Sequence, residues 1–160
     1  MRKKSEPSLR ARALQYLARR EHSRAELRGK LLRYVQENED SGREFDSSGQ
    51  ANLDALLDDL TARGWLSDER AAAQLVHLKR NRFGTQRITH ELRQKGIAEE
   101  LISAALPELK DSELAAAREV WQKKFGSMSQ DEKEKAKQVR FLQSRGFALD
   151  VVFKVLRLDD

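Results

Sequence analysis

The sequence predicts an all-α protein, a tandem array of three three-helix repeats that is elongated and curved. The first observation behind this prediction is composition. The 160 residues include 8 Gly, 2 Pro and 6% aromatic residues, but 36% are charged, and this balance favours helices over strands. The second observation is that apolar residues recur at spacings of three and four, which is typical of amphipathic helices. Because three-helix units bury little apolar surface alone, they must stack on their neighbours, and stacking gives an extended array.

The first repeat is predicted to span residues 9–63, after a flexible tail at residues 1–8. Its three helices are marked by three groups of apolar residues: Ala13, Leu14 and Leu17; Leu27, Leu31, Tyr34 and Val35; and Leu53, Leu56, Leu57 and Leu60. Ser23 and Glu26 form a capping-box pattern, which predicts that the second helix begins at residue 24. Residues 38–50 are rich in Asp, Glu, Ser and Gly, and we expect them to form an exposed acidic insertion.

The second and third repeats are predicted to span residues 67–106 and 111–157. Their six helices are bounded by Gly, Pro and capping residues: Ser67 to about Arg82, Thr85 to Gly96, one that stops before Pro107, and three that end at Phe125-Gly126, Gly146 and Leu156. A second capping box is expected at Ser129-Gln130-Asp131-Glu132. We expect Gly84 to take the left-handed conformation at a helix end and to match Gly126, and we expect Gly96 to match Gly146.

Both tryptophans are predicted to lie in the core. Trp65 follows Gly64 as Ile97 and Phe147 follow their glycines, and Trp121 lies on an apolar stripe. The alternative is that an exposed aromatic side chain beside an arginine stacks on nucleic-acid bases.

The net charge of +5 conceals alternating blocks. Residues 1–37 carry 11 Lys and Arg against 4 Asp and Glu, residues 38–69 carry 2 against 9, residues 70–95 carry 7 against 1, and residues 96–160 carry 11 against 12. Two basic blocks therefore flank an acidic one, so that a polyanion or an acidic partner is a candidate ligand. The densest basic stretch runs from Lys79 to Arg87 and continues to Arg93 and Lys95.

Patterns that indicate catalysis are missing from the sequence. There is no Cys, the three histidines have no metal-ligand spacing, and adjacent carboxylates such as Asp58 and Asp59 point about 100° apart on a helix. We therefore expect no enzyme activity, no cofactor and no metal. Without an apolar stretch long enough to span a bilayer, and without a signal-peptide pattern, we expect a cytoplasmic protein.

Four ordered motifs resemble one known family. They are Arg19-Arg20-Glu21-His22-Ser23-Arg24-Ala25-Glu26-Leu27, Gly64-Trp65-Leu66-Ser67-Asp68-Glu69-Arg70, the segment from Gly84 to Ile97, and Phe141-Leu142-Gln143-Ser144-Arg145-Gly146-Phe147. Together these resemble the RecX family of bacterial RecA regulators, from about Ala13 to Leu156. The sequence departs from the family pattern at Ala71-Ala72, where an aromatic residue is common, and in the acidic insertion.

The resemblance implies a function and a partner. A RecX-like array binds the RecA filament on single-stranded DNA, lodges in its helical groove, and curbs ATPase, strand-exchange and coprotease activities, which regulates recombination, DNA repair and the SOS response. We expect a monomer whose partner-binding residues are basic: Arg24, Arg28, Lys79, Arg80, Arg82, Arg87, Arg93 and Lys95. The alternative is a helical module that binds single- or double-stranded DNA directly through its basic patches.

Overall fold

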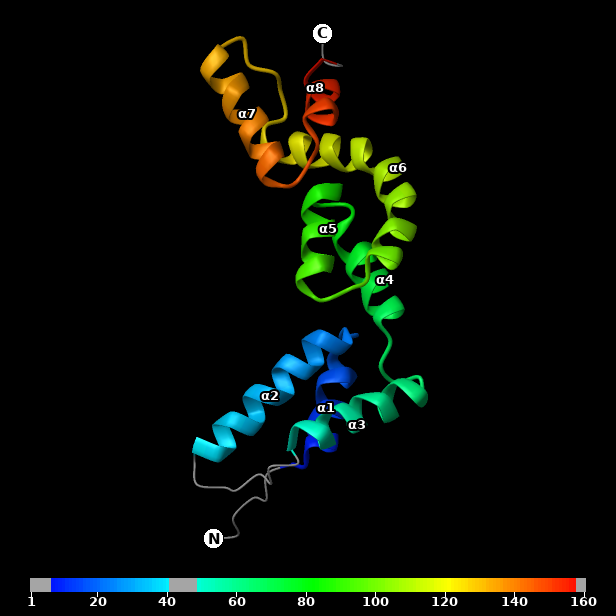
Figure 1. The fold of residues 1–160 in the computed structure, drawn as a ribbon. Helices are drawn as coiled ribbons and strands as arrows, with labels where there is room; N and C mark the ends of the chain where they lie inside the picture. Colours follow the sequence, from blue (N-terminus) through cyan, green and yellow to red (C-terminus); the bar gives the residue numbers. More distant parts are fainter. Residues whose placement is uncertain (1–6, 41–48, 158–160) are drawn as a thin grey trace. The chain divides into compact units, whose positions relative to one another are not determined.

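A computed structural model describes residues 7–40 and 49–157, which form eight α-helices and no strand (Figure 1). The helices are α1 (Leu9–Arg19), α2 (Arg24–Asp40), α3 (Gly49–Ala62), α4 (Asp68–Lys79), α5 (Thr85–Gln94), α6 (Glu99–Lys124), α7 (Glu132–Ser144) and α8 (Leu149–Arg157). The all-α prediction is therefore confirmed. The chain divides into two compact units, Met1–Ala71 and Ala72–Asp160, which we call unit 1 and unit 2. None of the described helices is long and apolar enough to cross a membrane.

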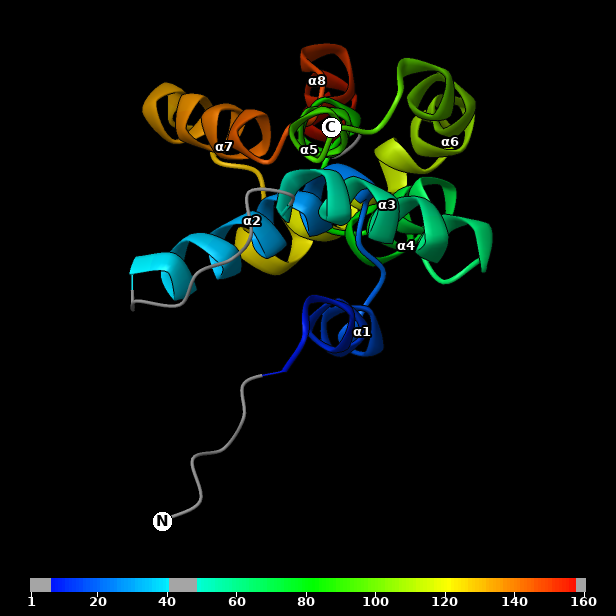
Figure 2. The ribbon, with the colours of Figure 1, turned by 60° about the horizontal axis from the view of Figure 1, so that its bottom comes forward.

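Unit 1 packs α1, α2 and α3 around one apolar core. Figure 2 shows the course of these three helices. Its buried members are mostly the leucines that the helical spacing singled out: Ala13, Leu27, Leu31, Leu53, Leu57, Leu60 and Leu66. The capping box at the start of α2 is confirmed, since the Glu26 N–H donates to Ser23 Oγ at 3.1 Å and the Ser23 N–H donates to Glu26 Oε1 at 3.4 Å. These two hydrogen bonds satisfy backbone donors that a helix start otherwise leaves unpaired.

The boundaries of the predicted insertion were wrong at both ends. Helix α2 continues to Asp40, and α3 begins at Gly49. Residues 38–40 and 49–50 are therefore helical, although Asn, Asp and Gly are weak helix formers. The rest of the insertion, and the first six residues of the predicted tail, lie outside the described residues.

Unit 2 contains two apolar cores that share one helix. The first core joins α4 and α5 to the first half of α6, with Ile88 and Leu92 fully buried. The second joins the other half of α6 to α7 and α8, with Leu142 and Val152 fully buried. Both cores follow the apolar spacing of the sequence.

The prediction that a helix stops before Pro107 was wrong. Helix α6 runs through Pro107 for 26 residues, from the first core to the second. Proline has no N–H to donate and crowds the preceding turn, so it kinks a helix that tertiary contacts hold on both sides. Figure 1 shows α6 changing direction near its middle. Leu109 packs in the first core and Ala116 in the second, which explains why the helix continues.

The glycines confirm one predicted pair and correct the other. Gly96 and Gly146 both have positive φ, 73° and 86°, at the ends of α5 and α7, as predicted. Gly126 also has positive φ, but Gly84 has φ −79° and is the N-cap of α5, so the prediction of a left-handed Gly84 equivalent to Gly126 was wrong. Gly84 is needed for close approach instead, because a Cβ atom there would lie 2.2 Å from the Gly146 carbonyl oxygen.

The second predicted capping box was also wrong. Helix α7 begins at Glu132, and its N-cap is Asp131, whose side chain accepts a hydrogen bond from the Lys133 N–H. Ser129 Oγ instead accepts from the Asp131 N–H at 3.1 Å. Aspartate is as good an N-cap as serine, so the helix start moves by two residues.

The two tryptophans lie in different environments. Trp121 is buried, with 4% of its surface exposed, as predicted, but Trp65 is 45% exposed, so the prediction for Trp65 was wrong. The backbone pattern after Gly64 does match the other repeats, since the Trp65 N–H donates to Leu60 O as the Ile97 N–H donates to Leu92 O. In unit 1, however, the next residue, Leu66, fills the core at 2% exposure.

Candidate functional site

The predicted site residues of unit 1 are paired with the acidic helix beside them. Arg24 and Arg28 lie on α2, and both face carboxylates of α3. Arg24 Nη2 lies 2.7 Å from Asp58 Oδ1, and Arg28 Nε lies 3.1 Å from Asp54 Oδ1. Exposed ion pairs of this kind contribute about 0.2–1 kcal/mol each to stability.

Four predicted residues of unit 2 also have acidic partners. Lys79 Nζ lies 2.7 Å from Glu91 Oε2, and Arg80 pairs with Glu108. Arg93 Nε lies 2.7 Å from Glu99 Oε1, and this hydrogen bond lowers the pKa of the Glu99 carboxyl below its ordinary value. Lys95 is the C-cap residue of α5.

The fourth, Arg87, has its Nε 4.0 Å from Glu91 Oε1 and also lies beside an aromatic ring, whereas Arg82 lines a hollow together with Phe141 and Arg145. Arg87 Cζ is 4.3 Å from the centroid of the Phe83 ring, and Arg145 Cζ is 5.2 Å from the same ring. Arg145 also lies 5.3 Å from the centroid of Phe141, which Lys124 Nζ approaches to 5.5 Å. Arg145 is therefore shared between two phenyl rings, and each contact of this type contributes about 0.5–1 kcal/mol when exposed.

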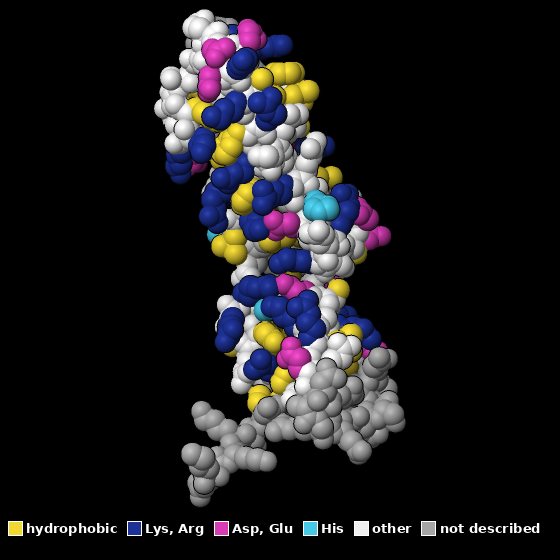
Figure 3. All heavy atoms as spheres, turned by 90° about the vertical axis from the view of Figure 1, so that its left-hand side faces the viewer, with side chains coloured by type: hydrophobic (Ala, Val, Ile, Leu, Met, Phe, Trp, Pro, Cys, Tyr) yellow, Lys and Arg dark blue, Asp and Glu magenta, His cyan; other side chains and the backbone are white. Residues whose placement is uncertain are grey.

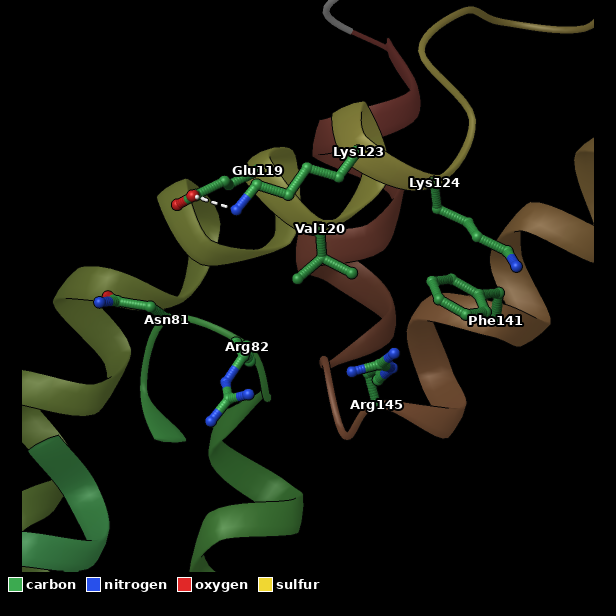
Figure 4. A pocket seen from close by; sticks show the side chains of 8 residues that line it. All are labelled: Asn81, Arg82, Glu119, Val120, Lys123, Lys124, Phe141 and Arg145. Atoms are coloured by element: carbon green, nitrogen blue, oxygen red, sulfur yellow. Dashed lines mark ion pairs between the residues drawn. The ribbon is translucent and has the colours of Figure 1, made fainter. Parts of the chain in front are cut away.

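Two hollows open beside these rings. The first, of about 270 Å³, is lined by Arg82 from the turn after α4, by Lys123 and Lys124 from α6, and by Phe141 and Arg145 (Figure 4). Figure 4 shows Lys123 turned toward Glu119, to which it is paired at 2.9 Å. The second hollow, of about 590 Å³, shares Lys124 and Phe141 with the first.

The linings of the hollows are strongly basic. Counting both, six side chains are basic, Arg82, Lys123, Lys124, Lys137, Arg140 and Arg145, and two are acidic, Glu119 and Glu134. We call these six basic residues, together with Phe83, Arg87 and Phe141, the basic–aromatic surface. Figure 3 shows dark blue Lys and Arg side chains interspersed with yellow hydrophobic ones on the side of unit 2 that it presents.

The corner that carries this surface is held by backbone contacts and one buried carboxylate. The Gly84 N–H donates to Arg145 O at 2.8 Å, and the Gln86 N–H donates to Gly146 O at 3.2 Å. Glu113, with 6% of its surface exposed, accepts at Oε1 from the Thr85 N–H at 3.4 Å and from the Ala148 N–H at 3.2 Å. These hydrogen bonds fix the first turn of α5 against the end of α7, so the arginines of both segments lie together.

Sequence reasoning missed most of this surface. It singled out Arg82 and Arg87, but it did not include the basic residues of α6 and α7. The reason is that the 11 basic and 12 acidic residues of 96–160 nearly cancel, which hides a local cluster. A usable signal was present, because Lys123-Lys124 precedes Phe125-Gly126 as Arg80 and Arg82 precede Phe83-Gly84.

The side chains of the basic–aromatic surface are suited to binding a ligand. Arginine forks bind phosphates and carboxylates in a bidentate way, and phenyl rings flanked by cations offer flat stacking surfaces. His77 and His90 are exposed, and no group of three or more His, Cys, Asp or Glu side chains able to hold a metal occurs in the part of the chain that is described. The fold defines a helical-repeat protein, and this surface is its candidate binding face.

Comparison with known proteins narrows this class to one family. The model of the second three-helix domain of RecX matches residues 67–106, and the model of the third matches residues 111–156. The chain belongs to the RecX family. The regulatory protein RecX of Leptothrix cholodnii is 47% identical over 153 residues, which cover 96% of this chain and 90% of that protein. The regulatory protein RecX of Ralstonia pickettii is 40% identical over 149 residues, or 93% of this chain and 86% of that one.

Solved structures share the helical-repeat fold. The crystal structure of RecX from Lactobacillus salivarius matches with a TM-score of 0.69 at 18% identity, and the match covers 94% of this chain and 93% of that one. A second crystal structure, of a regulatory protein RecX, also gives a TM-score of 0.69, at 20% identity, and covers 92% of this chain and 70% of that one. At these identities the likeness concerns the fold alone.

Proposed function

We propose that this protein regulates the RecA recombinase by binding the RecA–single-stranded DNA filament in its helical groove and lowering its ATPase, strand-exchange and coprotease activities. Membership of the RecX family carries the proposal, because relatives of 47% and 40% identity bear the name regulatory protein RecX. The protein acts in the cytoplasm as a monomer without catalytic activity of its own. Through RecA it regulates recombination, DNA repair and the SOS response.

The division into units at 9–63, 67–106 and 111–157 is part of this proposal. An array of helical units exposes long faces rather than an enclosed cleft. A long face suits contact with a polymer of repeating subunits better than it suits a small substrate. This is the physical reason to favour a filament as partner.

The basic–aromatic surface is the region of unit 2 that we assign to the contact. Arg82 and Arg87 belong to it, and Arg145 and Lys124 extend it. The other predicted contacts keep a secondary place in the proposal: Arg24, Arg28, Lys79, Arg80, Arg93 and Lys95. Exposed ion pairs such as Arg93–Glu99 exchange one carboxylate for another at little cost because solvent screens them, so present pairing does not prevent a role in binding.

The decisive experiment adds the protein to RecA filaments preformed on single-stranded DNA and follows ATP hydrolysis and cosedimentation. We expect hydrolysis to fall as the protein binds. The double variant Arg82→Gln/Arg145→Gln should need about tenfold more protein for the same effect, because two charged contacts are lost. Arg118→Gln, at an exposed position of α6 outside both hollows, is the matched control and should behave as the parent. Unchanged hydrolysis at saturating protein, with no cosedimentation, would contradict the proposal.

A second candidate function, direct binding to DNA, is favoured by the six basic side chains that line the two hollows. It predicts tight binding to bare DNA, with an affinity that falls steeply with salt because each neutralised phosphate releases counterions. Measuring affinity for bare DNA and for the filament at several salt concentrations separates the two functions. Tight binding to the filament together with weak binding to bare DNA would support RecA regulation over direct DNA binding.

A further inference from the structure

Trp65 forms an exposed aromatic platform in unit 1, outside the basic–aromatic surface. It follows Gly64, whose φ of +75° turns the chain at the end of α3, and the Trp65 N–H donates to Leu60 O at 3.0 Å. The backbone beneath the ring is therefore fixed by the helix end. The ring itself remains 45% exposed, while the next side chain, Leu66, fills the core.

Two arginines from different segments lie against this ring. Arg63 Cζ is 5.4 Å from the Trp65 ring centroid, and Arg10 Cζ, from α1, is 5.8 Å from it. Both guanidinium groups contact Asp59, Arg10 Nη1 at 2.9 Å and Arg63 Nε at 3.0 Å. Asp59 thus holds two cations beside one indole, and the hydrogen bond from Arg10 is the main cause that lowers the pKa of the Asp59 carboxyl below its ordinary value.

This arrangement combines the two elements of base recognition in single strands. Such sites offer an aromatic face on which an unpaired base stacks and cations that meet the flanking phosphates. The local charge of the cluster is positive, since two arginines share one aspartate. Both arginines are about half exposed, 42% and 52%, so either exchanges Asp59 for a phosphate at small cost.

We propose that Trp65, Arg10 and Arg63 form a site that stacks on one unpaired base of a single-stranded nucleic acid and contacts its neighbouring phosphates. A protein partner is less well matched, because protein hot spots are aromatic anchors surrounded by contacts that exclude water. The ring here is flanked instead by two hydrated cations. The site needs no RecA, so its test is separate from the test of the regulatory function.

The test compares two probes of equal length and equal phosphate number: fluorescein-labelled oligothymidylate and a fully abasic oligonucleotide. Fluorescence anisotropy at low salt gives the affinity of the full-length chain for each. Trp65→Leu keeps an apolar side chain but removes the flat ring. We expect this variant to bind oligothymidylate between about 5-fold and about 100-fold more weakly, and to bind the abasic strand as the parent does.

Two further variants calibrate the result. Trp65→Phe keeps an aromatic face and should recover most of the lost affinity for oligothymidylate. Phe153→Leu, at an exposed ring on α8 with a single arginine, Arg157, 5.8 Å away, is the matched control and should leave the affinity unchanged. Circular dichroism should show parental helicity for all three variants, since neither ring belongs to an apolar core.

A second measurement reads the stacking directly. In Trp121→Phe, Trp65 is the sole indole, and stacking on thymine should quench its emission as oligothymidylate is added. Trp121 is buried and donates to Gln138 Oε1, so if this variant unfolds, the comparison of the two probes decides alone.

Three outcomes with the oligonucleotide probes would overturn the proposal. They are equal losses on the two probes for Trp65→Leu, equal losses for Trp65→Leu and Phe153→Leu, and the absence of any binding to oligothymidylate by the parent. Loss of binding to a RecA filament without loss on oligothymidylate would also overturn it, and would assign Trp65 to a protein contact.

Discussion

The starts of α2 and α5 occupy corresponding places in the two units but are built in different ways. At α2, Ser23 and Glu26 cap the helix from within its first turn, and Asp68 adds one contact by accepting from the Arg24 N–H at 2.7 Å. At α5, the N-cap is Gly84, which has no side chain, and the capping carboxylate comes from Glu113, which is 28 residues from Thr85, whose N–H donates to it.

The difference shows that one helix start can be stabilised by residues near it in sequence and another by residues far from it. The start of α2 is encoded by residues that are neighbours in sequence, so it forms wherever that segment folds. The start of α5 depends on α6 and on the end of α7, because Glu113, Arg145 and Gly146 accept hydrogen bonds from the backbone N–H groups of Thr85, Gly84 and Gln86. The same hydrogen bonds fix the corner that carries the basic–aromatic surface.

Gly84→Ala should disrupt the long-range contacts at the start of α5 more than the other substitutions below. The added Cβ would lie 2.2 Å from the Gly146 carbonyl oxygen, so the backbone must separate and the Gly84–Arg145 and Gln86–Gly146 hydrogen bonds weaken. We expect a loss of about 3 kcal/mol or more in the free energy of unfolding, measured by urea titration with circular dichroism.

Gly29→Ala is the matched control in unit 1. Nothing lies within 4 Å of a Cβ atom at Gly29, which is inside α2, so this variant should gain about 0.5–1 kcal/mol. Similar losses for the two variants would show that the contact of Gly84 with Gly146 is not what holds the corner.

A smaller effect should separate the two capping carboxylates. Glu113→Gln removes a buried charge from the N-termini of both α5 and α8, and we expect a loss of about 2–3 kcal/mol. Asp68→Asn keeps an acceptor oxygen and removes only the charge beside a helix start that keeps its capping box, and we expect a loss of about 0.5–1 kcal/mol. Urea unfolding of both variants measures the difference, and a larger loss for Asp68→Asn would refute the assignment of long-range control to α5.

The smallest effect concerns pH and His22, which precedes the capping serine of α2. His22 is 1% exposed, and burial is the main cause that lowers the pKa of its imidazole below the ordinary value of 6.5. Its Nδ1 lies 3.0 Å from Arg20 O and its Nε2 lies 2.9 Å from Lys30 Nζ, so the ring donates to the carbonyl and accepts from the ammonium while neutral. The charges of Arg20 and Lys30 lower the pKa further, whereas Glu26 opposes them.

The sign of the pH effect follows from this lowered pKa. As pH falls below the ordinary value, the unfolded chain binds a proton that folded His22 resists, so stability present at neutral pH is lost toward acid. We expect the Tm of the parent to fall between about pH 7.5 and about pH 5.5, and the Tm of His22→Gln to fall less. His77→Gln, at an exposed position, should keep the parental slope, and an identical slope in His22→Gln would contradict this account.

The parts of the fold that were predictable are those encoded locally. Helix periodicity located most of the leucines of the three cores, though not Leu66 or Leu109, and the capping box placed the start of α2 at Arg24. Two errors arose where distant contacts override a local signal. Pro107 lies inside α6 because apolar cores hold the helix on both sides, and Gly84 is an N-cap because Gly146 approaches it closely.

The candidate site was predictable only in part, for the same reason. Arg82 and Arg87 were singled out by local charge density, but their grouping with Arg145 depends on a contact between segments about 60 residues apart. Trp65 was predicted to be buried because the residue after the matching glycine is buried in the other repeats. In unit 1 the buried side chain is that of the next residue, Leu66. Which of two adjacent apolar residues enters a core is decided by packing, and local spacing does not encode it.

The continuous helix α6 has a consequence for the cooperativity of folding. In most repeat proteins each unit has its own helices, so stability adds up from separate units and their interfaces. Here one helix contributes to two cores, and neither core is complete without it. Local opening of α5 and local opening of α8 both remove packing from α6. We therefore expect the second and third repeats to protect their amide hydrogens from exchange as one cooperative block.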